Sequence, residues 1–146
     1  MFNRLKIAVL PPGPRWACQV RFWVDGCDVV EAAVYEGGRG PFAAHVLQTD
    51  RPSPLAATNK ARRLRLGEPE CTGGCCGFLT AVVQRRGGLV VWSGWEGPRQ
   101  DHVPPDFHFD AEQYDAELAR ALADRWWDIY TDRAWRSPTR ADDTGF

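Results

Sequence analysis

The sequence predicts a single α+β domain, in which an antiparallel sheet of about five strands packs against one long carboxy-terminal helix. Two segments alternate apolar and polar residues on either side of a glycine-containing turn, which is typical of β-hairpins. A later segment repeats apolar residues at helical spacing. The 146 residues suit one domain, which we expect to span residues 1–137 and to be followed by a flexible polar tail over 138–146.

The first hairpin is predicted over residues 16–34. It turns at Asp25-Gly26, a pair that tolerates the positive φ of tight hairpin turns. A three-residue loop at this turn places Cys18 on the apolar face of the hairpin, and therefore in the core, whereas Cys27 lies at the turn itself.

Between the two hairpins the sequence predicts a short helix, a loop and one more strand. The helix is expected over residues 42–48, and Pro52 and Pro54 mark residues 49–60 as a loop. The strand, over residues 62–66, alternates arginine with leucine, so that the leucines face the core and the arginines face solvent.

The second hairpin, residues 78–85 with 89–95, carries apolar side chains on both faces. A two-residue loop at Arg86-Gly87 pairs the strands so that one face belongs to the core. The opposite face contains Phe78, Val82, Val91 and Trp95. Two interpretations remain open: this second face is covered by the rest of the chain, or it binds a partner protein or a second copy of the chain.

The carboxy-terminal helix is predicted over residues 110–129. Asp110 suits the N-cap with Gln113 three residues later, and Phe109 and Tyr114 occupy the two positions of a hydrophobic staple. Further apolar residues recur at helical spacing, at Leu118, Ala121, Leu122, Trp126 and Ile129. We therefore expect this face of the helix to pack on the sheet.

Three of the five cysteines, Cys71, Cys75 and Cys76, fall within six residues around a pair of glycines. A two-residue turn at Gly73-Gly74 places Cys71 opposite Cys76, with Cβ atoms about 4.5–5.5 Å apart. A modest adjustment brings them to the separation of about 3.5–4.5 Å found in disulfides. Cys71 and Cys76 are therefore the predicted redox pair, while Cys75 points to the other face.

The same thiols are also candidate zinc ligands. In the predicted register of the second hairpin, the chain after Trp95 runs next to the cysteine loop and carries His102. A Cys3His zinc site made of Cys71, Cys75, Cys76 and His102 is then possible, with His108 as a substitute fourth ligand. The C-x3-C-C spacing lacks the paired C-x2-C of a zinc ribbon, so purely structural thiols, or a cysteine nucleophile with His102 as its base, are the alternatives.

The net charge of −1 argues against a strongly basic nucleic-acid-binding domain. A local basic stretch could contact phosphates beside an exposed Trp23 or Trp95, although a solvated strand face explains it better. This stretch contains Arg51, Lys60, Arg62, Arg63 and Arg65. The apolar run before Pro11-Pro12 is too short for a signal peptide or a spanning helix, so we expect a cytoplasmic protein that does not bind membranes.

Three motifs stand out along the chain: E-C-x3-C-C-G at residues 70–77, V-V-W-S-x-W at 90–95 and F-x-F-D-A-x-Q-Y-D-A-E at 107–117. With these motifs the sequence resembles a group of small uncharacterised proteins of GC-rich bacteria, over about residues 16–127. The resemblance implies no activity and no catalytic residue.

The sequence shows no coherent set of acid and base residues, so we expect a non-enzymatic binding or interaction protein, such as an accessory, antitoxin-like or immunity-like partner. The predicted binding surface is the apolar, tryptophan-containing face of the second hairpin. The alternatives are a zinc-stabilised or thiol-redox protein centred on the C-x3-C-C loop, and a nucleic-acid-binding protein that uses the arginine-rich strand.

Overall fold

The computed structural model describes residues 1–34, 37–71 and 73–130, apart from the side chains of Cys75 and Gln100. The predicted tail over 138–146 therefore lies outside the described residues. The chain forms an α+β fold with two antiparallel sheets. The first sheet has the order β1-β2-β3, from β1 (Leu5–Leu10), β2 (Gln19–Val24) and β3 (Cys27–Asp28). The second has the order β4-β5-β6-β7, from β4 (Arg62–Gly67), β5 (Leu79–Arg86), β6 (Leu89–Glu96) and β7 (Phe107–Asp110).

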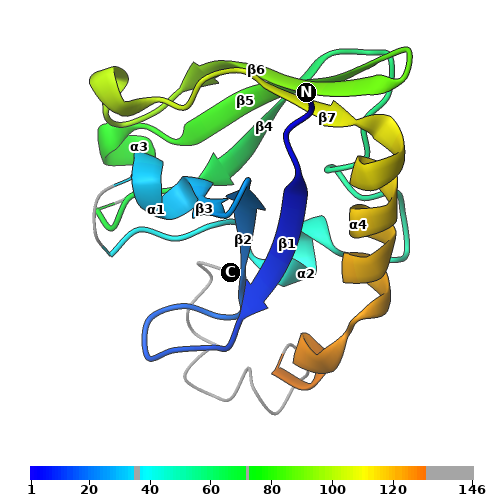
Figure 1. Cartoon of the computed structure of the whole chain (residues 1–146). Coiled ribbons are helices and arrows are strands. Elements are labelled where there is room, and N and C mark those ends of the chain that lie inside the picture. The colour runs from blue at the N-terminus through cyan, green and yellow to red at the C-terminus, as the bar shows by residue number, and fades with distance from the viewer. Residues whose placement is uncertain (35–36, 72, 131–146) are drawn as a thin grey trace.

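The predicted α+β class is confirmed, but the prediction of one five-stranded sheet is wrong. Figure 1 shows the four-stranded sheet above the three-stranded one, with the helix α4 (Ala111–Ala123) running down one side of both. The difference arises mainly at the amino terminus. Strand β1 was not predicted because its apolar run is short and ends at Pro11-Pro12, although Leu5 and Ile7 are buried.

Strand β1 lies at the edge of its sheet, where α4 covers its backbone. Gln113 exchanges two hydrogen bonds with the backbone of Leu5, at 3.0 and 2.8 Å. The Ile7 N–H donates to Glu117 at 2.6 Å, and Arg120 donates to the Ile7 carbonyl. Helix side chains thus occupy hydrogen-bonding groups that an exposed edge strand would otherwise present to other chains.

The first hairpin turns at Asp25-Gly26 as predicted, but through a two-residue loop. Both residues have positive φ, 53° and 86°, as a type I′ turn requires. The second strand, β3, ends after two residues because the Asp28 side chain accepts hydrogen bonds from the next turn and caps the helix α1 (Val29–Ala33). Residues 29–33 are therefore helical, which corrects the predicted strand. Cys18 is buried and Cys27 is exposed, as predicted.

The second hairpin turns at Gly87-Gly88, with Arg86 paired to Leu89. The predicted register is therefore wrong by two residues, which leaves each side chain on its predicted face because the side-chain period of a strand is two. A β-bulge then adds one residue to β6 at Gly94, whose φ is 60°. Beyond this bulge the alternation is reversed, and Trp95 lies on the same side as Trp92.

Helix α4 begins as predicted. The Asp110 side chain accepts from the Gln113 N–H at 3.1 Å, and the rings of the staple residues Phe109 and Tyr114 are 5.5 Å apart. The helix ends at Ala123, six residues before the predicted end, and a 3-10 helix, η2 (Trp126–Tyr130), follows. This change of geometry corrects the predicted packing, because Trp127 is buried whereas Trp126 and Ile129 are exposed.

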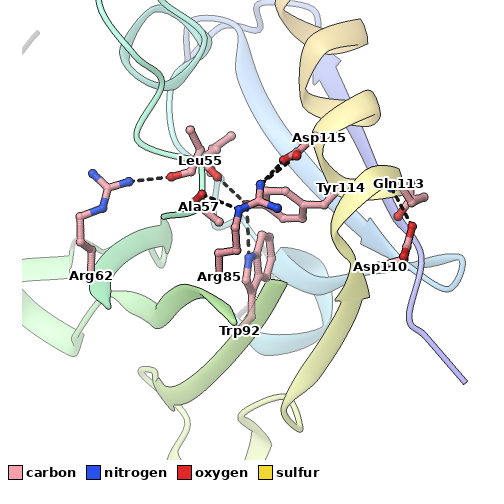
Figure 2. A network of polar contacts seen from close by, with 10 residues as sticks. Leu55, Ala57, Arg62, Arg85, Trp92, Asp110, Gln113, Tyr114 and Asp115 are labelled. Carbon is pink, nitrogen blue, oxygen red and sulfur yellow. Dashed lines mark hydrogen bonds and ion pairs between the residues drawn. The ribbon is translucent and has the colours of Figure 1, made fainter. Parts of the chain in front are cut away.

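Trp92 joins the two sheets and the helix at the centre of the core. Its ring lies edge to face with Phe22 of β2, Phe109 of β7 and Tyr114 of α4. Figure 2 shows how the predicted loop before β4 is held against this centre: the Tyr114 hydroxyl donates to the Leu55 carbonyl at 2.6 Å and accepts from Trp92 Nε1 at 3.4 Å. Within the described ranges, none of the helices is both long and apolar enough to cross a membrane.

Candidate functional site

The cysteine loop runs from the end of β4 to the start of β5. Its centre is a single helical turn, α3 (Gly73–Cys76), so the predicted two-residue turn at Gly73-Gly74 is wrong. The turn still reverses the chain and brings Cys71 and Cys76 together, with their sulfur atoms 2.6 Å apart. Both cysteines are exposed. Gly77 follows with a φ of 98°, a conformation that favours glycine after a helical turn.

The distance between these two sulfur atoms distinguishes two kinds of thiol chemistry. A disulfide has an S–S bond of about 2.05 Å. Two cysteines that bind one zinc ion tetrahedrally, with Zn–S distances of about 2.3 Å, have sulfur atoms roughly 3.8 Å apart. The two cysteines form no disulfide bond in the structure, and their separation of 2.6 Å lies between the two values, nearer to that of a disulfide.

His102, the predicted fourth zinc ligand, lies in the 3-10 helix η1 (Gln100–His102) and makes other contacts. Its Nδ1 is 3.0 Å from the Asp101 carboxylate and its Nε2 is 3.2 Å from the Arg99 guanidinium. The hydrogen bond from His102 lowers the pKa of Asp101 below its usual range. His108, the substitute ligand, is exposed on β7.

Among the side chains that the structure describes, three or more His, Cys, Asp and Glu residues do not gather anywhere in a metal-binding arrangement. The side chain of Cys75 is outside this description. The four-ligand zinc site therefore stays a prediction, whereas the pairing of Cys71 with Cys76 has a described geometry.

A pocket of about 280 Å³ lies beside the cysteine loop. Two of its lining residues, Glu68 and Phe78, are the first and last residues of the loop. The others come from the segment after α1, from the helix α2 (Ala43–Val46) and from β4. The side chains that carry its chemistry are Arg39, Phe42, His45, Arg65, Glu68 and Phe78.

Arg39 forms the inner wall of this basic aromatic pocket. Its guanidinium lies 4.0 Å from the centre of the Phe42 ring and pairs with the Glu68 carboxylate at 2.5 Å. The backbones of Arg39 and Glu68 also exchange two hydrogen bonds, at 2.9 and 2.8 Å. Burial lowers the pKa of Arg39, and the charge of Glu68 opposes that shift. Most of the Arg39 charge is thus neutralised within the protein.

Arg65, at the mouth of the pocket, is held differently. Its guanidinium lies 3.8 Å from the centre of the Phe78 ring, a cation–π contact. Among the residues described, no carboxylate lies within ion-pair distance of it. Arg63, two residues earlier on the same face, is instead bound to the Thr80 hydroxyl and the Gly94 carbonyl. Arg65 therefore gives the pocket mouth an uncompensated positive charge.

The predicted partner surface does not form one face. Val91 is only 6% exposed, and Val82 is half-buried. Phe78 lines the pocket under Arg65. Trp95 lies beyond the bulge on the core side, where its ring contacts Trp92 and its Nε1 donates to the Pro105 carbonyl at 2.9 Å.

The predicted arginine-rich stretch is likewise divided. Arg62 points to the loop before β4 and donates to the carbonyls of Pro54 and Ala56, at 3.1 and 2.8 Å. Arg63 and Arg65 face outward from β4 as predicted. Arg51 lies in the loop, 4.0 Å from the Asp50 carboxylate. Of these arginines, only Arg63 and Arg65 thus share the outer face of β4.

Sequence reasoning missed the pocket residues Arg39, His45 and Glu68. Arg39 stands in a glycine-rich stretch that resembles a break between elements, and its partner Glu68 is 29 residues away. Periodicity relates only near neighbours, so it gives no signal for such a pair. The exposure of Trp23, by contrast, follows from alternation along β2, where Phe22 and Val24 are buried.

Comparisons of this chain with protein-family models, with curated proteins and with solved structures find no match. A function is therefore argued from the chemistry of the site itself.

Proposed function

We propose that this chain is a small thiol–disulfide protein, in which Cys71 and Cys76 pass reversibly between a dithiol and an intramolecular disulfide. The observation that carries this proposal is the 2.6 Å separation of the two sulfur atoms on an exposed loop. Exposure matters because a thiolate must reach its reaction partner to exchange with it. The remaining cysteine with a described side chain on the surface, Cys27, lies at the turn of the first hairpin.

The geometry favours an internal disulfide over a mixed one. After a thiolate of the pair attacks an external disulfide, the second sulfur is already close enough to displace the bound half-molecule. Forming the internal disulfide needs little backbone movement, because the two sulfur atoms are already close and the loop is anchored by β4 at one end and β5 at the other (Figure 1). The zinc-stabilised alternative requires these two sulfur atoms to separate by roughly 1 Å to become tetrahedral ligands.

A thiol count tests the proposal. We expect the native protein to expose two fewer reactive thiols after mild oxidation than after reduction, with peptide mapping locating the bond between Cys71 and Cys76. The Cys71→Ser and Cys76→Ser variants should lose this difference. Cys27→Ser, which removes another exposed cysteine, should keep it.

Two results would contradict the redox proposal. A thiol count that never changes between oxidised and reduced samples excludes a reversible disulfide. One equivalent of zinc in protein purified without chelator, together with three thiols that react only after chelation, favours the predicted Cys71, Cys75, Cys76 and His102 site instead.

A second candidate keeps the predicted binding or interaction role but moves it to another surface. Trp23 is 37% exposed beside a hollow of about 640 Å³ on the first sheet, with Lys6 as its cross-strand neighbour. An exposed tryptophan in a hollow is typical of protein–protein contacts. If a second copy of the chain binds here, sedimentation should show a dimer that Trp23→Ala converts to a monomer. Trp126→Ala, at another strongly exposed tryptophan among the described residues, should leave the dimer intact.

A further inference from the structure

We infer that the disulfide exchanged by this thiol pair belongs to a small anionic molecule, whose carboxylate is bound by Arg65 at the mouth of the basic aromatic pocket. The inference rests on the proposed redox function of Cys71 and Cys76. It adds the chemical class of the substrate: a low-molecular-weight disulfide that carries a negative charge on each half.

The first step is the closeness of the thiols to the pocket. Cys76 precedes Phe78 by two residues, and Phe78 lies directly under the Arg65 guanidinium. An extended chain spans at most about 3.6 Å per residue, so the Cα atoms of Cys76 and Phe78 are within about 7 Å. At the other end of the loop, Cys71 follows the lining residue Glu68 by three residues. The Cα atom of Cys71 is therefore within about 11 Å of that of Glu68, so both cysteines lie close along the chain to residues that line the pocket.

The second step is the charge at the mouth of the pocket. The neighbouring carboxylates pair with other arginines: Glu68 with Arg39, Glu70 with Arg15 and Glu96 with Arg63. Arg65 keeps its charge without such a partner among the described residues. Its guanidinium is a planar fork, and stacking on a ring leaves the N–H groups at its edge available to a carboxylate.

The third step is the size of the pocket. Ligand sites for drug-sized molecules enclose about 300–1,000 Å³, whereas this pocket encloses about 280 Å³. It therefore suits one half of a small disulfide better than an extended polymer.

The reaction balances without a further cofactor. A thiolate of the pair attacks one sulfur of the substrate disulfide R–S–S–R; that bond breaks, and one R–S⁻ leaves and takes up a proton. The second cysteine, as its thiolate, then attacks the protein sulfur of the mixed disulfide and releases the second R–S⁻, which is also protonated. The protein dithiol is oxidised to a disulfide, and one substrate disulfide is reduced to two thiols.

Three disulfides with the same two-carbon spacer between sulfur and polar group test the role of charge: dithiodipropionate, which is anionic, bis(2-hydroxyethyl) disulfide, which is neutral, and cystamine, which is cationic. Each is added to the reduced protein, and formation of the Cys71–Cys76 bond is followed by mass spectrometry with peptide mapping. For each protein, the rate of oxidation by the anionic reagent is divided by the rate with the neutral reagent. Comparing this ratio between wild type and Arg65→Gln cancels the intrinsic reactivity of the reagents.

We expect this ratio to be about three- to five-fold higher in wild type than in Arg65→Gln, the size of an exposed charge pair. It should fall towards the variant's value at high salt, and the cationic reagent should show the opposite trend. Arg65→Lys should retain part of the effect. Arg63→Gln, which removes the same charge from the same strand face, should match wild type.

Two different failures are distinguishable. If the Cys71–Cys76 bond forms with all three reagents but the ratio is equal in wild type and Arg65→Gln, the substrate inference is wrong and the redox function stands. If none of the reagents links the two cysteines, the redox function itself is overturned, and the inference with it.

Discussion

Replacing Tyr114 with phenylalanine tests how the core holds the loop that precedes β4. The Tyr114 side chain is fully buried, and its hydroxyl makes two hydrogen bonds, one as donor and one as acceptor (Figure 2). It donates to the Leu55 carbonyl at 2.6 Å and accepts from Trp92 Nε1 at 3.4 Å. Burial raises the pKa of this hydroxyl well above its usual range, so it stays protonated and remains a donor at neutral pH.

The expected cost of this substitution follows from what phenylalanine leaves behind. Its ring keeps the edge-to-face contact with Trp92, at 6.2 Å between centres, so the loss of packing is small. The Leu55 carbonyl and the Trp92 N–H are left buried without their partner, and an unsatisfied buried group costs about 1–3 kcal/mol. Since the bond to Trp92 is long, we expect a total loss of about 2 kcal/mol in the free energy of unfolding.

Urea denaturation followed by tryptophan fluorescence measures this change. For a small protein with an m-value of about 2 kcal/mol per M, the midpoint should fall by about 1 M with an unchanged slope. Tyr114→Leu, which also removes the ring, should lose clearly more. A loss below about 0.5 kcal/mol in Tyr114→Phe would refute the reasoning, because it would mean that the Leu55 carbonyl does not depend on the hydroxyl.

Two further predictions concern the edge strand and the bulge. Burial raises the pKa of Glu117, but the hydrogen bonds from Arg120 and Ile7 and the nearby positive charges outweigh it and lower the pKa. The stability that ionised Glu117 contributes is therefore present above the usual carboxylate pKa of about 4.3 and is lost as the pH falls through the lowered value. In urea denaturation at a series of pH values, Glu117→Gln should lose less stability on acidification than wild type does. An equal loss of stability in the two proteins would contradict this assignment. Gly94→Ala should lose about 1 kcal/mol because φ there is 60°, whereas Gly88→Ala, with open space around its Cβ position, should not lose stability; equal losses would argue against a bulge at Gly94.

The parts of the fold that the sequence predicts are those governed by local rules. The Asp25-Gly26 turn follows from the positive φ that these residues tolerate, and the Asp110 cap from a side chain that accepts a backbone N–H. Up to the bulge at Gly94, the faces of the second hairpin were predicted although the register was not. Arg86-Gly87 and Gly87-Gly88 are both acceptable turns, and the two pairings differ by two residues, which keeps each side chain on its face.

The division into two sheets depends on long-range contacts that no local rule contains. Strand β1 is stabilised by hydrogen bonds to Gln113, Glu117 and Arg120, more than 100 residues later in the chain. A six-residue run with five apolar residues before two prolines gives no indication of that helix. The early end of α4 is a similar case, since Trp126 and Trp127 both suit a helix and only tertiary packing selects which is buried.

The candidate site shows the same boundary between local and long-range information. The closeness of Cys71 and Cys76 was predicted with the wrong backbone, because a two-glycine turn and a single helical turn both reverse the chain within six residues. The pocket beside them was not predicted. It depends on the pairing of Arg39 with Glu68, which brings together the end of β4 and the segment after α1.

The bulge at Gly94 connects these observations. One additional residue in β6 turns Trp95 towards Trp92 and so removes the tryptophan from the surface that was predicted to bind a partner. The same bulge presents the Gly94 carbonyl to Arg63 at 2.8 Å, and Glu96 lies within 3.8 Å of the same guanidinium. Arg63 is thus bound within the sheet, while Arg65 stays over Phe78 at the mouth of the pocket. The bulge therefore removes Trp95 from the expected apolar face and binds Arg63 to the Gly94 carbonyl. Arg65, on the same face of β4, has no carboxylate partner among the described residues, and β4 leads directly into the cysteine loop, which is why we propose the function there.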